Sequence, residues 1–185
     1  MKSNIELMKK SLDNIDIKSL EELIHVLIIS KEYNNTMYIC GNGGSAGTAT
    51  HIACDLTKIG KLNSISLCDN VPLITAITND EGWDYIFTEQ LGVMKPGDIL
   101  MVISVHGGSG EDKAGLWSQN LVRAVEYAKS MDNLTISLTG FDGGLLKEIT
   151  DININIDADS TPIVESMHSV VGHLLAFELN EGDRK

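Results

Sequence analysis

An imidazole and a carboxylate stand four residues apart in the first third of the chain, at His51 and Asp55. Between them lie only apolar or small residues, Ile52, Ala53 and Cys54. If the segment is helical, His51 and Asp55 project from one face, because positions i and i+4 are neighbours on a helix. Such a pair can be a surface ion pair or a general acid and base. The apolar neighbours favour the second interpretation, since an idle carboxylate on a mostly buried helix is costly.

A glycine-rich turn comes immediately before this segment. The β-prone residues 36–40 run into Gly41-Asn42-Gly43-Gly44-Ser45, and Ser45 is the expected N-cap of the helix that follows. Glycines let backbone N–H groups approach a ligand closely, and a helix N-terminus adds partial positive charge. The turn is therefore predicted to bind a phosphate group or another anion.

A second loop of similar type follows the continuous apolar run 99–103. It begins Ser104-Val105-His106-Gly107-Gly108. Such a run is typical of a strand buried on both faces of a parallel sheet. Ligands of open α/β sheets bind beyond the carboxyl ends of the strands, so the two loops should face one crevice.

A long helix predicted from Thr161-Pro162 onward carries Glu165, His168 and His173 among apolar residues. At about 100° per residue, positions 165 and 173 lie about 80° apart, so both side chains can address one pocket. For His168 we favour a hydrogen-bonded imidazole in the core or at an interface.

The elements that must hold these groups alternate along the chain. Residues 3–34 have the apolar spacing of two helices, which could pack on the chain's own sheet or on another subunit. Strands are expected at 36–40, 64–67, 99–103, 134–138 and 152–156, and helices after 44, at 71–77, 84–91 and 118–130, and from 161 onward. This order predicts a single α/β domain over 1–185: N-terminal helices at 1–34, then at 35–185 a three-layer, doubly wound, five-stranded parallel sheet with a C-terminal helix.

Composition restricts the function. The 185 residues carry a formal net charge of −12, which argues against a nucleic-acid or anionic membrane partner. No apolar run approaches the ~20 residues of a membrane span. The N-terminal residues lack the apolar core of a signal peptide, so a cytoplasmic protein is expected.

The ordered motifs together resemble the sugar isomerase (SIS) domain family, of the phosphoheptose isomerase type. They are GNGGSA, the helical histidine and acid four apart, NDEGWD, DILMVIS with its Gly/Ser loop, LTGFDGG and ESMHSVVGH. The likeness runs from residue 20 nearly to the end. It implies the SIS fold and an aldose–ketose isomerase that interconverts sedoheptulose 7-phosphate and D-glycero-D-manno-heptose 7-phosphate through an enediol(ate). It also implies a homotetramer with active sites between subunits.

Carried over by position, the resemblance implies roles for individual residues. Asp55 and His173 would be the catalytic acid/base pair. A zinc ion would be held by His51, Asp55, Glu165 and His173, a suitable donor set. Contacts to phosphate and sugar would come from Asn42, Ser45, Asp80, Ser104 and Ser118, to which we add Gly43, Gly44, His106 and Glu165.

Three features depart from the family pattern. Asp55 stands for a glutamate, Glu165 stands for a glutamine and raises the expectation of a metal, and His106 stands where a serine is expected. The loop 107–117 is longer than usual and could be a lid, a specificity element or a plain insertion.

Two other functions remain open beside the phosphoheptose isomerase. One is an isomerase of another sugar phosphate, and the other is a non-catalytic tetramer that binds a sugar phosphate or a replication initiator.

Overall fold

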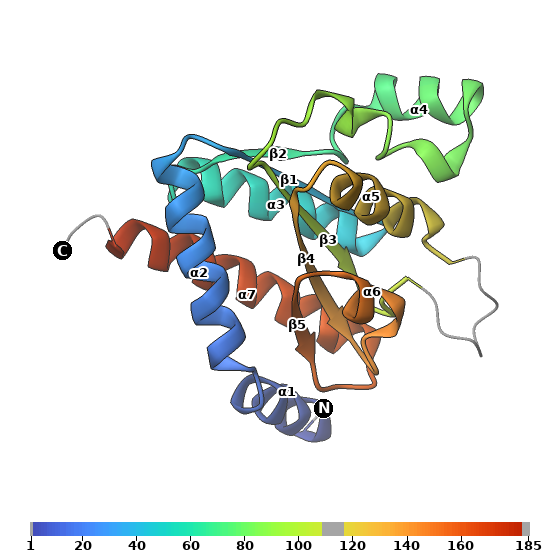
Figure 1. Ribbon diagram of the computed structural model, residues 1–185. Helices are drawn as coiled ribbons and strands as arrows, with labels where there is room; N and C mark the ends of the chain where they lie inside the picture. The colour runs from blue at the N-terminus through green and yellow to red at the C-terminus, as the bar shows by residue number, and fades with distance from the viewer. Residues whose placement is uncertain (1, 109–116, 183–185) are drawn as a thin grey trace.

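The computed structural model describes residues 2–108 and 117–182, and of residues 181–182 the backbone alone. Its strands are β1 (Thr36–Gly41), β2 (Asn63–Ser66), β3 (Ile99–Ser104), β4 (Leu134–Gly140) and β5 (Ile152–Ile156). All neighbours pair in parallel, in the order β2-β1-β3-β4-β5. The predicted five-stranded parallel sheet is confirmed (Figure 1).

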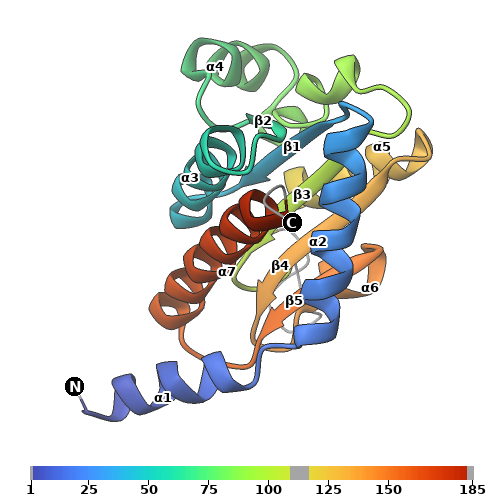
Figure 2. The same cartoon turned by 90° about the vertical axis from the view of Figure 1, so that its left-hand side faces the viewer.

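Helices cover both faces of this sheet (Figures 1 and 2). The α-helices are α1 (Lys2–Asp13), α2 (Ile17–Glu32), α3 (Gly44–Lys58), α4 (Val71–Asp80), α5 (Gln119–Ser130), α6 (Gly144–Ile149) and α7 (Thr161–Gly182). Two short 3₁₀ helices, η1 (Trp83–Tyr85) and η2 (Gln90–Val93), lie between α4 and β3. Among the described helices, none has the length and apolar character needed to cross a membrane.

Successive residues of the strands point into two separate cores, as the period of two along a strand requires. In β1, Met37 and Ile39 join the core beneath α2, α3 and α7. Tyr38 and Cys40 join the opposite core, to which α5 contributes most of the helical side chains. The sheet is therefore the middle of three layers.

The two N-terminal helices differ in how they pack. α2 buries Leu20, Leu23 and Leu27 in the core of its own sheet, and it contacts α7 and β5. Of the two packing alternatives, the chain's own sheet is correct for α2. α1 instead leaves the apolar side chains of Ile5, Met8 and Leu12 exposed.

Several local predictions were wrong at element ends. α3 begins at Gly44 and its N-cap is Gly43, at φ 57°, so Ser45 lies inside the first turn. Residues 84–91 do not form one α-helix: they span the end of η1 and the start of η2, and Ile86, Phe87 and Leu91 are buried in the core. α4 extends through Asp80 into the expected polar loop, and α6 was not predicted.

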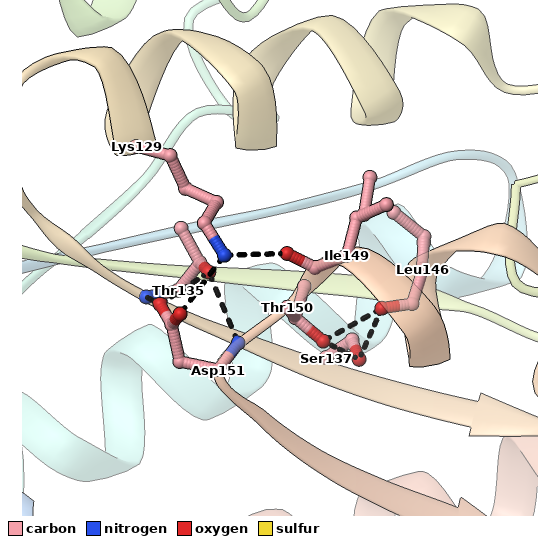
Figure 3. A network of polar contacts seen from close by, with 7 residues as sticks. All are labelled: Lys129, Thr135, Ser137, Leu146, Ile149, Thr150 and Asp151. Atoms are coloured by element: carbon pink, nitrogen blue, oxygen red, sulfur yellow. Dashed lines mark hydrogen bonds and ion pairs between the residues drawn. The ribbon is translucent and has the colours of Figure 1, made fainter.

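A polar network ties the end of α5 to the start of β5 (Figure 3). Lys129 Nζ donates to Asp151 Oδ1 at 2.9 Å and to the Ile149 carbonyl at 2.8 Å. Asp151 Oδ2 accepts from the backbone N–H and the hydroxyl of Thr135. Partial burial by itself would raise the pKa of Asp151, but these hydrogen bonds outweigh it and hold the pKa below its ordinary value.

We expect Asp151→Asn to lower the free energy of unfolding by about 1 kcal/mol at pH 7. The effect is at the low end for charged hydrogen bonds because water screens this partly exposed carboxylate. A depressed pKa contributes stability above the unfolded pKa and loses it as pH falls through the folded pKa. The difference between variant and wild type should therefore shrink below about pH 4. Urea unfolding at pH 7 and pH 3 measures this difference, and the control is Asp159→Asn, a change at an exposed position. An equal difference in the free energy of unfolding at both pH values would contradict the prediction.

Candidate active site

Three of the predicted site residues converge where α3 packs on α7. His51 and Asp55 come from α3 and His173 from α7. Asp55 Oδ2 lies 3.3 Å from His51 Nε2 and 3.4 Å from His173 Nε2. The two Nε2 atoms lie 3.1 Å apart. We call these three residues the trio. The Asp55 side chain is 13% exposed, whereas the imidazoles of His51 and His173 are 58% and 48% exposed.

A glycine allows the two helices to approach this closely. Gly172, next to His173, faces Ile52, next to His51. A Cβ at Gly172 would overlap Ile52 Cγ1 and lie 2.7 Å from Ile52 Cδ1, closer than real side chains allow. The absence of a side chain at position 172 therefore lets His173 reach across to α3.

The donor atoms of the trio fit a metal ion. Three ligand atoms about 2.0–2.1 Å from a tetrahedral zinc ion would be separated by about 3.3 Å from one another. The Nε2, Oδ2 and Nε2 atoms of the trio form a triangle with sides of 3.1 to 3.4 Å. Two imidazole nitrogens that face each other and a carboxylate are typical of a cation site, so the trio could hold a metal ion.

A cavity of about 300 Å³ opens at the N-terminal end of α3. Both loops predicted from the sequence contribute to it, which confirms that they face one crevice. Its walls are formed by Asn42, Gly43, Gly44, Ser45, Ile103, Ser104, Val105, His106, Gly108, Trp117, Ser118, Thr161 and Glu165.

Glu165 lies on the cavity side of α7, two turns before His173. Its carboxylate occupies the space beside Gly44, where a Cβ would come within 2.8 Å of Glu165 Cδ. Within the described chain, Glu165 is not part of the trio's group of donor atoms. Its role as a fourth metal ligand stays a prediction.

His106 stands in the cavity wall among aromatic rings. Its imidazole lies 4.4 Å from the ring of Phe141 and 6.1 Å from that of Trp117, measured between centroids. Its predicted contact with a phosphate remains untested. The stretch 109–116 of the predicted loop lies outside the described residues.

Of the other residues predicted to contact phosphate or sugar, Ser104 and Ser118 line the cavity and Asp80 does not. Ser104 ends β3 and is buried in the cavity wall, and Ser118 is the N-cap of α5 with a left-handed backbone at φ 60°. Asp80 is different, because it ends α4, accepts a hydrogen bond from the neighbouring Asn79 and is not in the cavity wall of this chain.

His168 is a core residue, as expected. It is 1% exposed, and its Nε2 forms a 3.0 Å hydrogen bond with the Thr139 carbonyl. Burial lowers the pKa of His168 to about 4, and the hydrogen bond opposes this only in part. The imidazole is therefore neutral at neutral pH and joins α7 to β4.

Sequence reasoning missed three residues that shape the site. Gly172 faces Ile52, and Asn120, in the first turn of α5, exchanges hydrogen bonds with Asn42. These contacts join residues far apart in the chain, and nothing local marks them. Thr161 was read only as the start of a helix, yet it lines the cavity. Its signal was present, because the first turn of a helix after a parallel strand lies at the ligand edge of the sheet.

Comparisons with known proteins agree with this geometry. The sequence profile of the SIS domain matches residues 3–140. A phosphoheptose isomerase from Helicobacter pylori is 36% identical over 178 residues, covering 92% of this chain and 86% of that protein.

Solved structures give the same result over nearly the whole chain. A phosphoheptose isomerase from Neisseria gonorrhoeae has a TM-score of 0.86 at 25% identity, covering 97% of this chain and 94% of that one. One from Francisella tularensis has a TM-score of 0.86 at 26% identity, covering 100% and 94%. The chain therefore belongs to the SIS domain family, among the phosphoheptose isomerases.

Proposed function

We propose that the protein is an aldose–ketose isomerase that converts sedoheptulose 7-phosphate to D-glycero-D-manno-heptose 7-phosphate. One observation carries the proposal: the cavity and the trio lie along the same pair of helices, α3 and α7. From Ser45 to His51 the axis of α3 rises about 9 Å. An extended sugar phosphate can bridge this span, with its phosphate at the glycine turn and its carbonyl end at the trio.

Isomerisation requires a base for the proton on the carbon beside the carbonyl, and an acid for the oxygens. We assign the base to Asp55. Its Oδ2 faces both imidazoles, so Oδ1 is the oxygen assigned to proton transfer. The C–H electron pair forms the double bond of the enediol(ate), and the proton returns to the neighbouring carbon. His173 is assigned the exchange of protons with the sugar oxygens, through its Nδ1, because its Nε2 faces Asp55 and His51.

The phosphate is assigned to the two loops of the cavity. Gly43 and Gly44 offer backbone N–H groups at the start of α3, and Ser45, Ser104 and Ser118 offer hydroxyls. No lysine or arginine belongs to the described cavity wall, so binding depends on these neutral donors and on His106.

We further propose that the resident metal is zinc, bound by His51, Asp55 and His173, with Glu165 as the fourth ligand. When bound, zinc would supply Lewis-acid stabilisation of the negative charge on the enediolate oxygens. Ligation by Asp55 Oδ2 and His173 Nε2 would also keep these side chains in place beside the sugar.

The proposed active form is a homotetramer with active sites at subunit interfaces, in the cytoplasm. Support comes from exposed apolar side chains next to the trio: Leu174 and Phe177 are 41% and 54% exposed and follow His173 on α7. Ile5, Met8 and Leu12 form a second apolar stripe on α1. Burial of such surfaces against another copy is their usual explanation. A second copy could also bring Asp80 to the sugar.

The decisive experiment is incubation in D₂O with sedoheptulose 7-phosphate, fructose 6-phosphate or arabinose 5-phosphate, with and without added zinc. We expect deuterium incorporation and product only with the seven-carbon sugar. Exchange with another sugar would support the alternative isomerase. If no sugar exchanges under either condition, the protein is not an isomerase of these sugars, and a sugar-phosphate-binding role is favoured instead.

For the metal, we expect His51→Ala to weaken zinc binding by roughly a hundredfold or more. Mutation of residues that only hydrogen-bond to a metal ligand already lowers metal affinity by about 10- to 100-fold. Competition with a chromophoric chelator measures the affinity directly and needs no activity. His25→Ala, an exposed histidine on α2, is the matched control. Equal zinc affinity in both variants would exclude the trio as the zinc site.

A further inference from the structure

A reciprocal pair of side-chain amides connects the two sides of the cavity. Asn42 Nδ2 donates to Asn120 Oδ1 at 2.9 Å, and Asn120 Nδ2 donates to Asn42 Oδ1 at 2.9 Å. Asn120 is fully buried, at 0% exposure. Its Oδ1 also accepts from the backbone N–H of Leu121 at 3.0 Å, which holds the amide in one orientation.

Each partner belongs to a different phosphate-binding segment. Asn42 lies in the turn after β1, and its carbonyl accepts from the Ser45 N–H, which closes that turn. Asn120 lies in the first turn of α5, two residues after Ser118. Asn42 and Asn120 are 78 positions apart in the chain, so the amide pair sets the separation of the two segments directly.

We propose that Asn120 is a positioning residue that holds the glycine turn and the start of α5 at the spacing a phosphate group needs. This inference rests on the proposed function. Asn120 itself does not line the cavity, whereas Asn42, Ser45 and Ser118 do. It acts through Asn42, whose second N–H remains for the ligand.

The pairing has a chemical signature, because a protonated carboxyl group has the same shape and the same donor and acceptor as a primary amide. In Asn120→Asp, an ionised carboxylate would face Asn42 Oδ1 with no hydrogen between them, and the turn would be pushed away. A protonated carboxyl would restore both hydrogen bonds. Burial favours this neutral form, so protonation should occur well above the ordinary range of an aspartate.

The groups that face this position are few. From α5 they are the Leu121 amide and the Ser118 N-cap, and from the glycine turn Asn42. The titratable or charged residues of the neighbouring cavity wall are His106, after β3, and Glu165, on α7. Both are present in the wild type and in every variant, so their titration cancels when each variant is compared with the wild type at the same pH.

The test measures the inhibition constant of inorganic phosphate and the KM for sedoheptulose 7-phosphate in Asn120→Ala and Asn120→Asp. Asn133→Asp is the matched control, because Asn133 is also a buried asparagine that accepts a backbone hydrogen bond, but it lies before β4 and outside the cavity wall. Thermal unfolding of all four proteins records the purely structural cost.

For Asn120→Ala we expect the inhibition constant of phosphate and the KM each to rise by roughly tenfold, with a smaller change in kcat. The lost hydrogen bonds are worth about 1.4 kcal/mol, which corresponds to a factor of about ten in affinity. For Asn120→Asp the loss relative to wild type should be large at pH 8 and smaller at pH 6. Asn133→Asp should change the unfolding temperature without changing phosphate binding.

Three outcomes would overturn the inference, each in a different way. If the wild type binds phosphate and isomerises, but both Asn120 variants keep its phosphate affinity and KM, Asn120 has no positioning role. A pH-independent loss in Asn120→Asp equal to that of Asn120→Ala would reject the amide pairing as the cause. If the wild type neither binds phosphate nor isomerises, the proposed function fails and this inference falls with it.

Discussion

Replacing Asp55 with asparagine is expected to lower kcat/KM for the sugar phosphate by roughly 10²- to 10⁴-fold, the usual contribution of a positioned acid or base. The change preserves the shape of the side chain but removes the base and the negative charge that faces His51 and His173. His173→Ala should give a loss of the same order, because we assign both residues to the same proton-transfer unit. Steady-state kinetics with a coupled assay for the aldose product would measure both.

The control for these variants is Glu126→Gln, an exposed acid-to-amide change on α5, which packs on the other face of the sheet from the trio. It should leave kcat/KM within about twofold, as expected for a surface change away from the site. Turnover near that of the wild type in both Asp55→Asn and His173→Ala would show that the trio does not carry the chemistry. The zinc content of each variant should be measured alongside. Added zinc can restore activity that was lost with the metal, but it cannot restore activity that was lost with the base.

Gly172→Ala is expected to destabilise the protein by about 2 kcal/mol and to reduce kcat by on the order of a hundredfold. The added Cβ would overlap Ile52 Cγ1, which is attached close to the backbone and cannot swing away. Overpacking of this kind costs about 1–3 kcal/mol. The helices must separate to relieve it, and a displacement of about 1 Å between catalytic groups can cost a hundredfold in rate. Urea unfolding and steady-state kinetics report the two effects.

Two comparisons isolate the cause. Gly47→Ala is the matched helical control, because a Cβ there meets nothing within 4 Å and alanine favours a helix over glycine by about 1 kcal/mol. It should be neutral or stabilising. The double variant Gly172→Ala, Ile52→Ala removes the overlapping atoms, so it should recover part of the activity lost in Gly172→Ala alone. If the double variant is as inactive as Gly172→Ala, close packing at this point is not what positions His173.

Much of the fold followed from local patterns. The apolar run 99–103 predicted a buried parallel strand and residues 134–138 a further strand, and these became β3 and β4 with one or two further residues at their ends. The spacing of His51 and Asp55 placed both on one helix face, which depends only on the pitch of a helix. In contrast, residues 84–91 have helical spacing but form short 3₁₀ turns. There, Gln90 Nε2 donates to the carbonyl of Ile86 and also to that of Leu67, which is far away in the chain, a contact that no local pattern predicts.

By itself, the sequence determined the order of the strands along the chain, the glycine turn after the first of them, and the family to which the chain belongs. These are set by residues close together in the chain, where backbone geometry and side-chain period act directly. Only the tertiary structure decided that His173 meets His51 and Asp55, that Glu165 lies beside Gly44 instead, and that Asn120 pairs with Asn42. Each of these contacts joins residues 78 or more positions apart, and each depends on how closely two elements pack, to within the width of a methyl group.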